Sequence, residues 1–205
     1  MKFLKQFFSN LNKSINQIKI EEEQNLVNSK IEIKSNQMNF SQNNIINELV
    51  KFGITREDFF KRKEELYNKS KIKDNDNDVF WSLCNELLIK NASDYNKLRT
   101  IYYSMAIFLH QEGKDNFILL QESARATLNQ FNLSDLEVNV EINGCSDSCE
   151  NCKKMNGKII PMDEAYSALP IPCKACTHSI GFCRCFYSAI PIRDADGMLI
   201  PKLNR

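Results

Sequence analysis

Apolar residues recur every three or four positions between residues 45 and 131, the spacing that predicts amphipathic helices. Gly53 is suited to end the first of these helices, because glycine readily adopts the left-handed conformation at a helix C-terminus. Thr55 and Asp58 resemble a capping box at the start of the second. The predicted apolar helix faces are, in order, 45–50, 59–67, 79–88, 98–109 and 117–128. We therefore predict a helical domain over residues 45–133.

The period of the pattern changes from helical to alternating at Leu136. From there to Ile142, apolar and polar residues alternate, which is typical of a half-buried strand. The further elements predicted after it are strands at 157–160, 186–190 and 198–200 and a short helix at 163–169. The pattern thus indicates a small β module over residues 134–192, followed by a C-terminal tail over residues 193–205.

The first 44 residues differ from both of these regions. Apolar residues between Phe3 and Ile18 have helical spacing and predict an amphipathic helix over residues 1–20. Such a helix docks to a partner or a membrane surface, or packs on its own domain, and the pattern leaves these alternatives open. Residues 21–44 are rich in Glu, Asn, Gln, Ser and Lys and are predicted to be a polar linker.

Composition and charge exclude several broad classes. The N-terminus has no continuous apolar segment of the signal-peptide type, and no run approaches the roughly 18 apolar residues that span a bilayer. We therefore expect no transmembrane segment and a cytoplasmic protein. With 27 basic and 26 acidic residues, the net charge of +1 gives no reason to expect a strong attraction of the whole chain to nucleic acid or membranes.

Seven of the eight cysteines fall between residues 145 and 185. In a reducing compartment such a cluster favours metal binding over disulfides. The even number of cysteines also fits a secreted disulfide framework, which is the alternative interpretation. Cys84 stands apart from the cluster on the apolar face of a predicted helix, so we expect it to be a buried thiol.

The clustered cysteines have the spacing of metal ligands. Cys149 and Cys152, and again Cys173 and Cys176, are separated by two residues, so that both sulfurs of a tight turn can face one tetrahedral ion. Thiolates suit zinc and iron–sulfur clusters alike, but the compact cysteine runs of ferredoxins are missing, which favours zinc. Spacing alone favours these four cysteines as ligands. The remaining potential ligands are Cys145, His178, Cys183 and Cys185, which leaves room for a second site.

A structural metal is expected rather than a catalytic one. A catalytic zinc keeps an open position and normally recruits histidine or a carboxylate, and the chain has only two histidines. The segment from Pro172 to Cys176 matches one of the two parts of the zinc-deaminase sequence signature. The other part fails, because Glu150 directly follows Cys149 instead of standing two residues after a ligand. We therefore expect the protein not to be an enzyme.

Two other functions stay open on sequence grounds. Basic residues near the cysteines suit phosphate contacts, although neighbouring acidic residues dilute their charge. These basic residues are Lys153, Lys154, Lys158, Lys174 and Arg184. A Cys-x-x-Cys pair also suits thiol redox chemistry, but no thioredoxin-like βαβ pattern surrounds either pair.

The segment 125–187 resembles the C-terminal part of phage head-morphogenesis proteins of the Mu F-like minor head family. The similar features are a helix bearing Arg125, a strand, Asp147-Ser148-Cys149 with Cys152 and Gly157, a Pro-containing loop at 170–172, and a closing Cys183-Arg184-Cys185. The resemblance implies an assembly protein with a protein partner, associated with a virion if it is of phage origin. It also favours the Cys183-Arg184-Cys185 end as the second half of the metal site.

Together these observations predict an α+β fold, with a helical N-terminal domain followed by a small zinc-stabilised β module. The predicted ligands of Zn²⁺ are Cys149, Cys152 and Cys176, with Cys183 or Cys185 as the fourth. Cys173, Cys145 and His178 are the competing ligands. The leading predicted function is a non-enzymatic zinc-binding interaction or assembly protein, with a nucleic-acid-binding zinc module and a thiol redox protein as alternatives.

Overall fold

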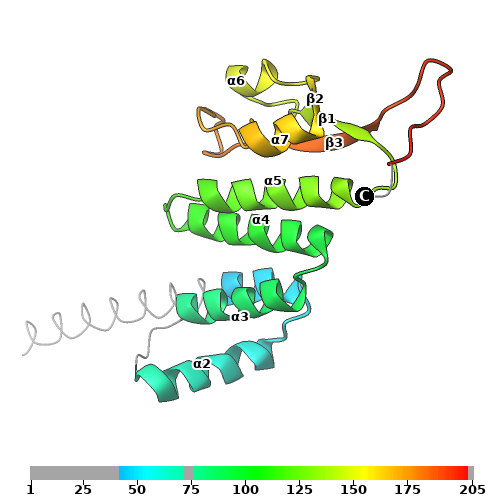
Figure 1. The fold of residues 1–205 in the computed structure, drawn as a ribbon. Helices are drawn as coiled ribbons and strands as arrows, with labels where there is room; N and C mark the ends of the chain where they lie inside the picture. Colours follow the sequence, from blue (N-terminus) through cyan, green and yellow to red (C-terminus); the bar gives the residue numbers. More distant parts are fainter. Residues whose placement is uncertain (1–41, 72–75, 203–205) are drawn as a thin grey trace, which may run out of the picture. The chain divides into compact units, whose positions relative to one another are not determined.

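The computed structural model describes residues 42–71 and 76–202 (Figure 1). The helix predicted over residues 1–20 and most of the linker predicted over residues 21–44 lie outside the described residues. The chain divides into two compact units, Met1–Phe80 and Trp81–Arg205. Helices make up the N-terminal part and a small antiparallel sheet follows them, so the predicted α+β class is confirmed.

The described part of the first unit consists of helices joined by short turns. Residues 42–50 are helical, α2 spans Arg56–Ser70, and α3 (Asp76–Lys90) begins in this unit. The predicted capping box is confirmed, because the Thr55 hydroxyl accepts a hydrogen bond from the Asp58 N–H and the Asp58 carboxylate accepts one from the Thr55 N–H at 2.8 Å. Gly53 follows the first helix with a φ of +79°, as the sequence predicts. The buried side chains of this unit include Ile45, Ile46, Leu49, Phe59, Val79 and Phe80.

A helical hairpin forms one side of the second unit. Its helices are α4 (Tyr95–Gln111) and α5 (Phe117–Asn132). The carboxylate of Asp94 accepts a hydrogen bond from the Lys97 N–H at 3.1 Å and so caps α4. Between the two helices, the hydroxyl of Ser123 donates to the Arg99 carbonyl at 2.9 Å. The two helices pack side by side as a hairpin (Figure 1).

The sheet of the second unit has three antiparallel strands in the order β2-β1-β3. They are β1 (Val138–Asn143), β2 (Ile159–Pro161) and β3 (Phe186–Pro191). Buried and partly buried residues alternate along β1, as its sequence pattern predicts. The β1–β3 register runs from Val138 opposite Pro191 to Asn143 opposite Phe186. The end of β1 therefore lies beside the start of β3, although a long stretch of chain separates them.

Two short helices lie between the strands, and one predicted strand is not formed. The helix α7 (Met162–Ala168) was expected, whereas α6 (Glu150–Lys153) was not. The strand predicted at 198–200 is wrong, because the segment makes two isolated bridges to different partners. Leu199 pairs with Arg193, and Pro201 pairs with Leu136. The hydrogen bonds of this second bridge flank Pro201, from the Glu137 N–H to the Ile200 carbonyl at 2.8 Å and from the Lys202 N–H to the Asp135 carbonyl at 2.7 Å.

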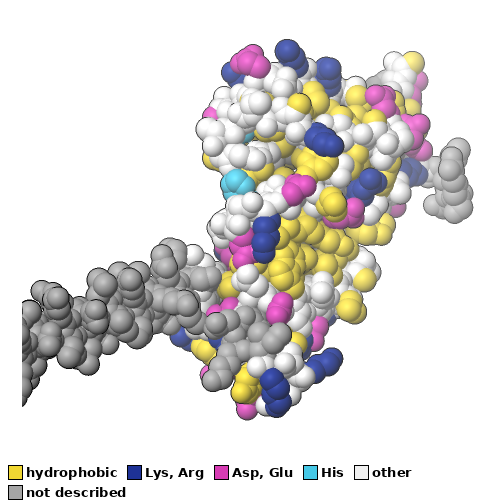
Figure 2. Space-filling model, turned by 90° about the vertical axis from the view of Figure 1, so that its left-hand side faces the viewer, with side chains coloured by type: hydrophobic (Ala, Val, Ile, Leu, Met, Phe, Trp, Pro, Cys, Tyr) yellow, Lys and Arg dark blue, Asp and Glu magenta, His cyan; other side chains and the backbone are white. Residues whose placement is uncertain are grey.

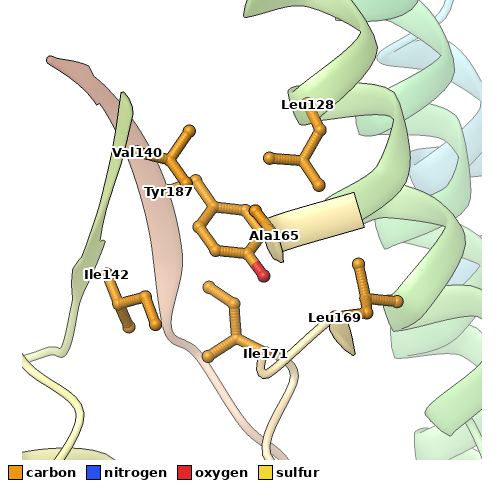
Figure 3. Close-up of a cluster of buried hydrophobic side chains, with 7 residues drawn as sticks. All are labelled: Leu128, Val140, Ile142, Ala165, Leu169, Ile171 and Tyr187. Carbon is orange, nitrogen blue, oxygen red and sulfur yellow. The ribbon is translucent and has the colours of Figure 1, made fainter. Parts of the chain in front are cut away.

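One hydrophobic core joins the sheet to α5 and α7 (Figure 3). Leu128 projects from α5 toward Val140 of β1 and Tyr187 of β3, and all three are buried. The complete set of buried residues in this core is Leu128, Val140, Ile142, Ala165, Leu169, Ile171 and Tyr187. The last helix before the sheet thus shares its core with the segment that contains the clustered cysteines.

Leu128→Ala should destabilise this core, because it removes a fully buried side chain that bridges α5 and the sheet. We expect a loss of about 3 kcal/mol in the free energy of unfolding, measured by chemical denaturation. The matched control is Leu133→Ala, since Leu133 is 62% exposed and its replacement should cost less than about 0.5 kcal/mol. Equal losses in the two variants would show that Leu128 does not carry the contact between α5 and the sheet.

Candidate metal centre

The ends of β1 and β3 place two cysteine-bearing segments side by side. Cys149 and Cys152 follow β1, and Cys183 and Cys185 directly precede β3. The two segments approach one another because the last residue of β1 pairs with the first residue of β3. A further contact joins the two segments, because the Cys145 sulfur lies 3.6 Å from the backbone carbonyl oxygen of Arg184.

Five cysteine sulfurs lie within ligating distance of one another in two overlapping groups. Cys149, Cys152 and Cys176 form one group, and Cys152, Cys183 and Cys185 form the other; within each group the sulfurs lie within 4.8 Å. Cys152 belongs to both groups and is buried. Groups of thiols at these distances are compatible with a bound metal ion.

The individual sulfur–sulfur distances match the edges of a metal tetrahedron. The Sγ atoms of Cys149 and Cys176 are 3.8 Å apart, and those of Cys152 and Cys176 are 3.7 Å apart. The Cys152 and Cys183 sulfurs are also 3.7 Å apart. Zinc–sulfur bonds of about 2.3 Å at tetrahedral angles require neighbouring sulfurs about 3.8 Å apart. These three distances are therefore compatible with thiolate ligation of a metal ion.

Backbone N–H groups stabilise the Cys149 sulfur as a thiolate. Cys149 stands at the start of α6, where its sulfur accepts a hydrogen bond from the Thr177 N–H at 3.4 Å and faces the N–H of Cys152. These two donors lower the pKa of Cys149 to about 6. The Asn151 amide also donates to the Ala175 carbonyl at 2.7 Å, which ties α6 to the segment that carries Cys176.

The thiols of Cys152, Cys176 and Cys185 resist ionisation. Burial raises the pKa values of Cys152 and Cys176, and it raises that of Cys185 to about 12. Neighbouring cysteines add to the rise in the pKa of Cys152, because its protonated thiol donates toward Cys185 and Cys149 and because of the charge of Cys183. A bound metal ion would lower these pKa values, because its positive charge stabilises the thiolate form of each ligand.

The other sequence-predicted ligands lie outside both sulfur groups. Cys173 stands at the start of a turn in which the Cys176 N–H donates to the Cys173 carbonyl at 3.1 Å, and only Cys176 faces the cluster. Cys145 contacts the Arg184 carbonyl instead. Cys84 is fully buried in α3, as expected, and burial raises its pKa to about 12. All eight cysteines are free thiols.

His178 is buried in a polar cluster of its own rather than directed at the sulfurs. Its Nδ1 accepts a hydrogen bond from the Ile180 N–H at 3.1 Å, and its Nε2 lies 3.3 Å from the Asp147 carboxylate. Arg184 also pairs with Asp147. Hydrogen bonding from His178, with a further contribution from Arg184, lowers the pKa of the Asp147 carboxyl. With both ring nitrogens engaged, His178 positions the loop between Cys176 and Cys183.

A contact with α4 also holds the loop between Cys176 and Cys183. The ring of His110 packs edge-on against that of Phe182, with 4.9 Å between ring centroids. Gly181 has a φ of +86°, and a Cβ there would stand 2.7 Å from Cε1 of His110. Only glycine therefore fits at position 181 without displacing the histidine. Sequence reasoning missed the roles of His110 and Gly181, because the contact joins residues far apart in the chain.

Comparison with protein-family models, curated proteins and solved structures gives no significant match. The resemblance of segment 125–187 to the Mu F-like minor head family therefore stays a prediction. Among the described helices, none combines the length and the hydropathy that a membrane span requires.

The pKa values of the thiols predict a steep pH dependence of metal binding. Metal must displace the protons of Cys152 and Cys176, whose pKa values are raised, whereas Cys149 is already ionised above about pH 6. Affinity for Zn²⁺ should therefore rise from pH 6 to pH 9, with release of at least about two protons per ion at pH 7. Titration calorimetry in buffers of different ionisation enthalpy measures this number. A heat that is independent of the buffer would contradict the assignment of these thiols as ligands.

Proposed function

We propose that the protein is a non-enzymatic assembly or interaction protein whose cysteine-rich segment folds around one structural zinc ion. The observation that carries the zinc proposal is a series of three sulfur–sulfur distances of 3.7–3.8 Å, which link Cys149 to Cys176, Cys176 to Cys152, and Cys152 to Cys183. Thiolates are soft ligands that suit zinc, and the tetrahedral edge for zinc has this length.

Among the two competing fourth ligands, the distances favour Cys183. Its sulfur lies at tetrahedral-edge distance from that of Cys152, and the residue is only 5% exposed. Cys185 lies in the same group of sulfurs and is the reserve ligand. The proposed set is therefore Cys149, Cys152, Cys176 and Cys183.

A set of four thiolates supports a structural role for the metal. Four-cysteine sites are closed, whereas catalytic zinc keeps a position open for water or substrate. The histidine nearest in sequence to these ligands, His178, has both ring nitrogens engaged elsewhere. The proposal accordingly assigns the ion to folding and assigns no reaction to the protein.

The assembly role rests on the family resemblance and on the kind of site proposed. A metal ion with four protein ligands fixes the conformation of the surrounding surface, which a partner can then recognise. Such a site has no open position for catalysis. The resemblance of segment 125–187 to minor head proteins of phages favours a protein partner, in the cytoplasm of the host cell and then in the virion. Free thiols throughout the chain agree with a reducing compartment.

Nucleic-acid binding is the second candidate, and one observation favours it. Lys154, Lys158 and Lys174 are exposed, and none forms an ion pair within the described part of the chain. Lys153, by contrast, pairs with Glu150 at 2.9 Å. Figure 2 shows Lys and Arg side chains at the level of α6, with acidic side chains among them. We rank this candidate second because the acidic groups weaken the field that phosphates would meet.

Protein purified without added metal should contain about one zinc per chain by elemental analysis, since a four-thiolate site binds zinc tightly. Cys183→Ser should lose most of this zinc, because it removes a ligand. The same replacement at Cys173 should leave the zinc content unchanged, because Cys173 lies outside both sulfur groups. Replacing zinc with Co²⁺ provides a second readout through the visible absorption of tetrahedral thiolate cobalt.

The opposite pattern would overturn the ligand assignment: loss of zinc in Cys173→Ser with retention in both Cys183→Ser and Cys185→Ser. Iron in place of zinc in the purified protein would contradict the choice of metal but would still support a metal site made of thiolates. A metal-free protein with an unchanged folded spectrum would contradict the structural site as a whole.

Gel-shift experiments at two salt concentrations separate the two candidate functions. The assembly proposal predicts no complex with a short single-stranded or double-stranded oligonucleotide at about 0.15 M salt. A nucleic-acid-binding module would instead form a complex that weakens steeply with salt. The triple variant Lys154→Gln, Lys158→Gln, Lys174→Gln should then reduce its affinity. Such a result would establish the second candidate in place of the first.

A further inference from the structure

A pocket of about 340 Å³ lies beside the cysteine cluster, wholly within the unit Trp81–Arg205. Helices α4 and α5 line one side of it, and the Ile171–Pro172 segment and the chain leading into β3 line the other. Its volume is within the range of small-ligand sites, at the lower end of about 300–1,000 Å³. A pocket of this size accommodates a group of about one residue rather than an extended segment.

Within the described part of the chain, the charged side chains that line the pocket are those of Arg99 and Arg184, and no acidic residue lines it. Arg99 is exposed, and its guanidinium makes no hydrogen bond or ion pair within the described part of the chain. Arg184 uses Nη2 for Asp147 and for Nε2 of His178, and its Nε is buried out of reach of a ligand. Its Nη1 makes no hydrogen bond within the described part of the chain and is the donor that Arg184 offers to the pocket. The pocket therefore offers unused guanidinium donors to an anion.

Three hydroxyls of the pocket are committed to the protein itself, whereas the Tyr187 hydroxyl is buried without a hydrogen-bond partner among the described residues. The hydroxyls of Thr100, Ser123 and Thr127 each donate to a backbone carbonyl, at 3.0, 2.9 and 3.1 Å. The remaining lining is mostly apolar or aromatic and includes Leu120, Ala124, Ile171, Pro172 and Phe186. A ligand that fits these surroundings has an apolar body and one anionic group placed against the arginines.

We propose that this pocket binds the C-terminal residue of a partner polypeptide, with its carboxylate on Arg99 and Arg184 and an apolar side chain against α5. A chain end carries its carboxylate and its side chain on one residue, so both fit a pocket of this size. An internal acidic residue would need room for the backbone on both sides. The proposal deepens the assembly role, on which it rests, by naming the chemistry through which the partner is held.

The test uses the zinc-loaded full chain and three small probes. N-acetyl-L-phenylalanine represents a chain end, N-acetyl-L-phenylalaninamide is its neutral counterpart, and an acetylated and amidated Phe-Glu dipeptide represents an internal acid. Only the first should shift the amide NMR signals of residues lining the pocket, such as Thr100 and Thr127. Its affinity should fall as salt is raised, because the interaction is between opposite charges.

Arg99→Gln should weaken binding of N-acetyl-L-phenylalanine about tenfold, through loss of a charge-assisted hydrogen bond. The matched control is Arg125→Gln, an exposed arginine of α5 that does not line the pocket. Thr100→Trp, at an exposed lining position, should block the pocket and abolish binding. Both Arg99→Gln and Thr100→Trp should keep the zinc content of the unchanged protein, so a failure here is distinguishable from a failure of the zinc site.

Three results would overturn the proposal. They are absence of binding by N-acetyl-L-phenylalanine, equal binding by its amide or by the dipeptide, and affinity that is the same in Arg99→Gln as in Arg125→Gln. The Co²⁺-substituted protein adds a fourth criterion. Its visible spectrum should not change on ligand addition, and a change would mean that the carboxylate binds the metal instead of the arginines.

Discussion

The pairing of β1 with β3 is the constraint on which the C-terminal part of the molecule depends. These strands are neighbours in the sheet, yet β1 ends at Asn143 and β3 begins at Phe186. Closing a long connection costs conformational entropy, which the burial of Ala165, Leu169 and Ile171 in the core offsets in part. Cysteines 149 and 152 follow one strand and cysteines 183 and 185 precede the other, so an ion held between them closes the connection at its two ends.

The same cluster is unfavourable without an ion. Burial raises the pKa values of Cys152, Cys176 and Cys185, and close thiolates would repel each other. Cys149 is the exception, because backbone N–H groups of Cys152 and Thr177 stabilise its charge. One ionised thiol beside several protonated thiols favours stepwise metal binding. Cys149 would bind the ion first, and the charge of the ion would then promote ionisation of the other thiols. In this account, metal binding and folding of the connection are one process.

The sequence predicts the elements better than it predicts the site. Helices, the capping box at Thr55 and the alternation along β1 are local patterns, and they appear where they are expected. Spacing cannot distinguish Cys173 from Cys176, because both stand in one Cys-x-x-Cys pair. A tertiary hydrogen bond from Asn151 to the Ala175 carbonyl holds that turn. The approach of His110 to Gly181 is also invisible in the sequence, since it depends on how α4 packs against the loop.

The position of Arg184 connects the proposed metal site to the proposed pocket. It stands between Cys183 and Cys185, so an ion bound by either cysteine would fix the backbone on one side of the arginine. Its guanidinium is held from outside the pocket by Asp147, which in turn contacts the buried His178. Loss of the metal would free the backbone at Cys183 and, with it, the arginine that lines the pocket. Partner binding should therefore require the metal even though the ligand does not touch it, which is the behaviour of an ion that organises a surface.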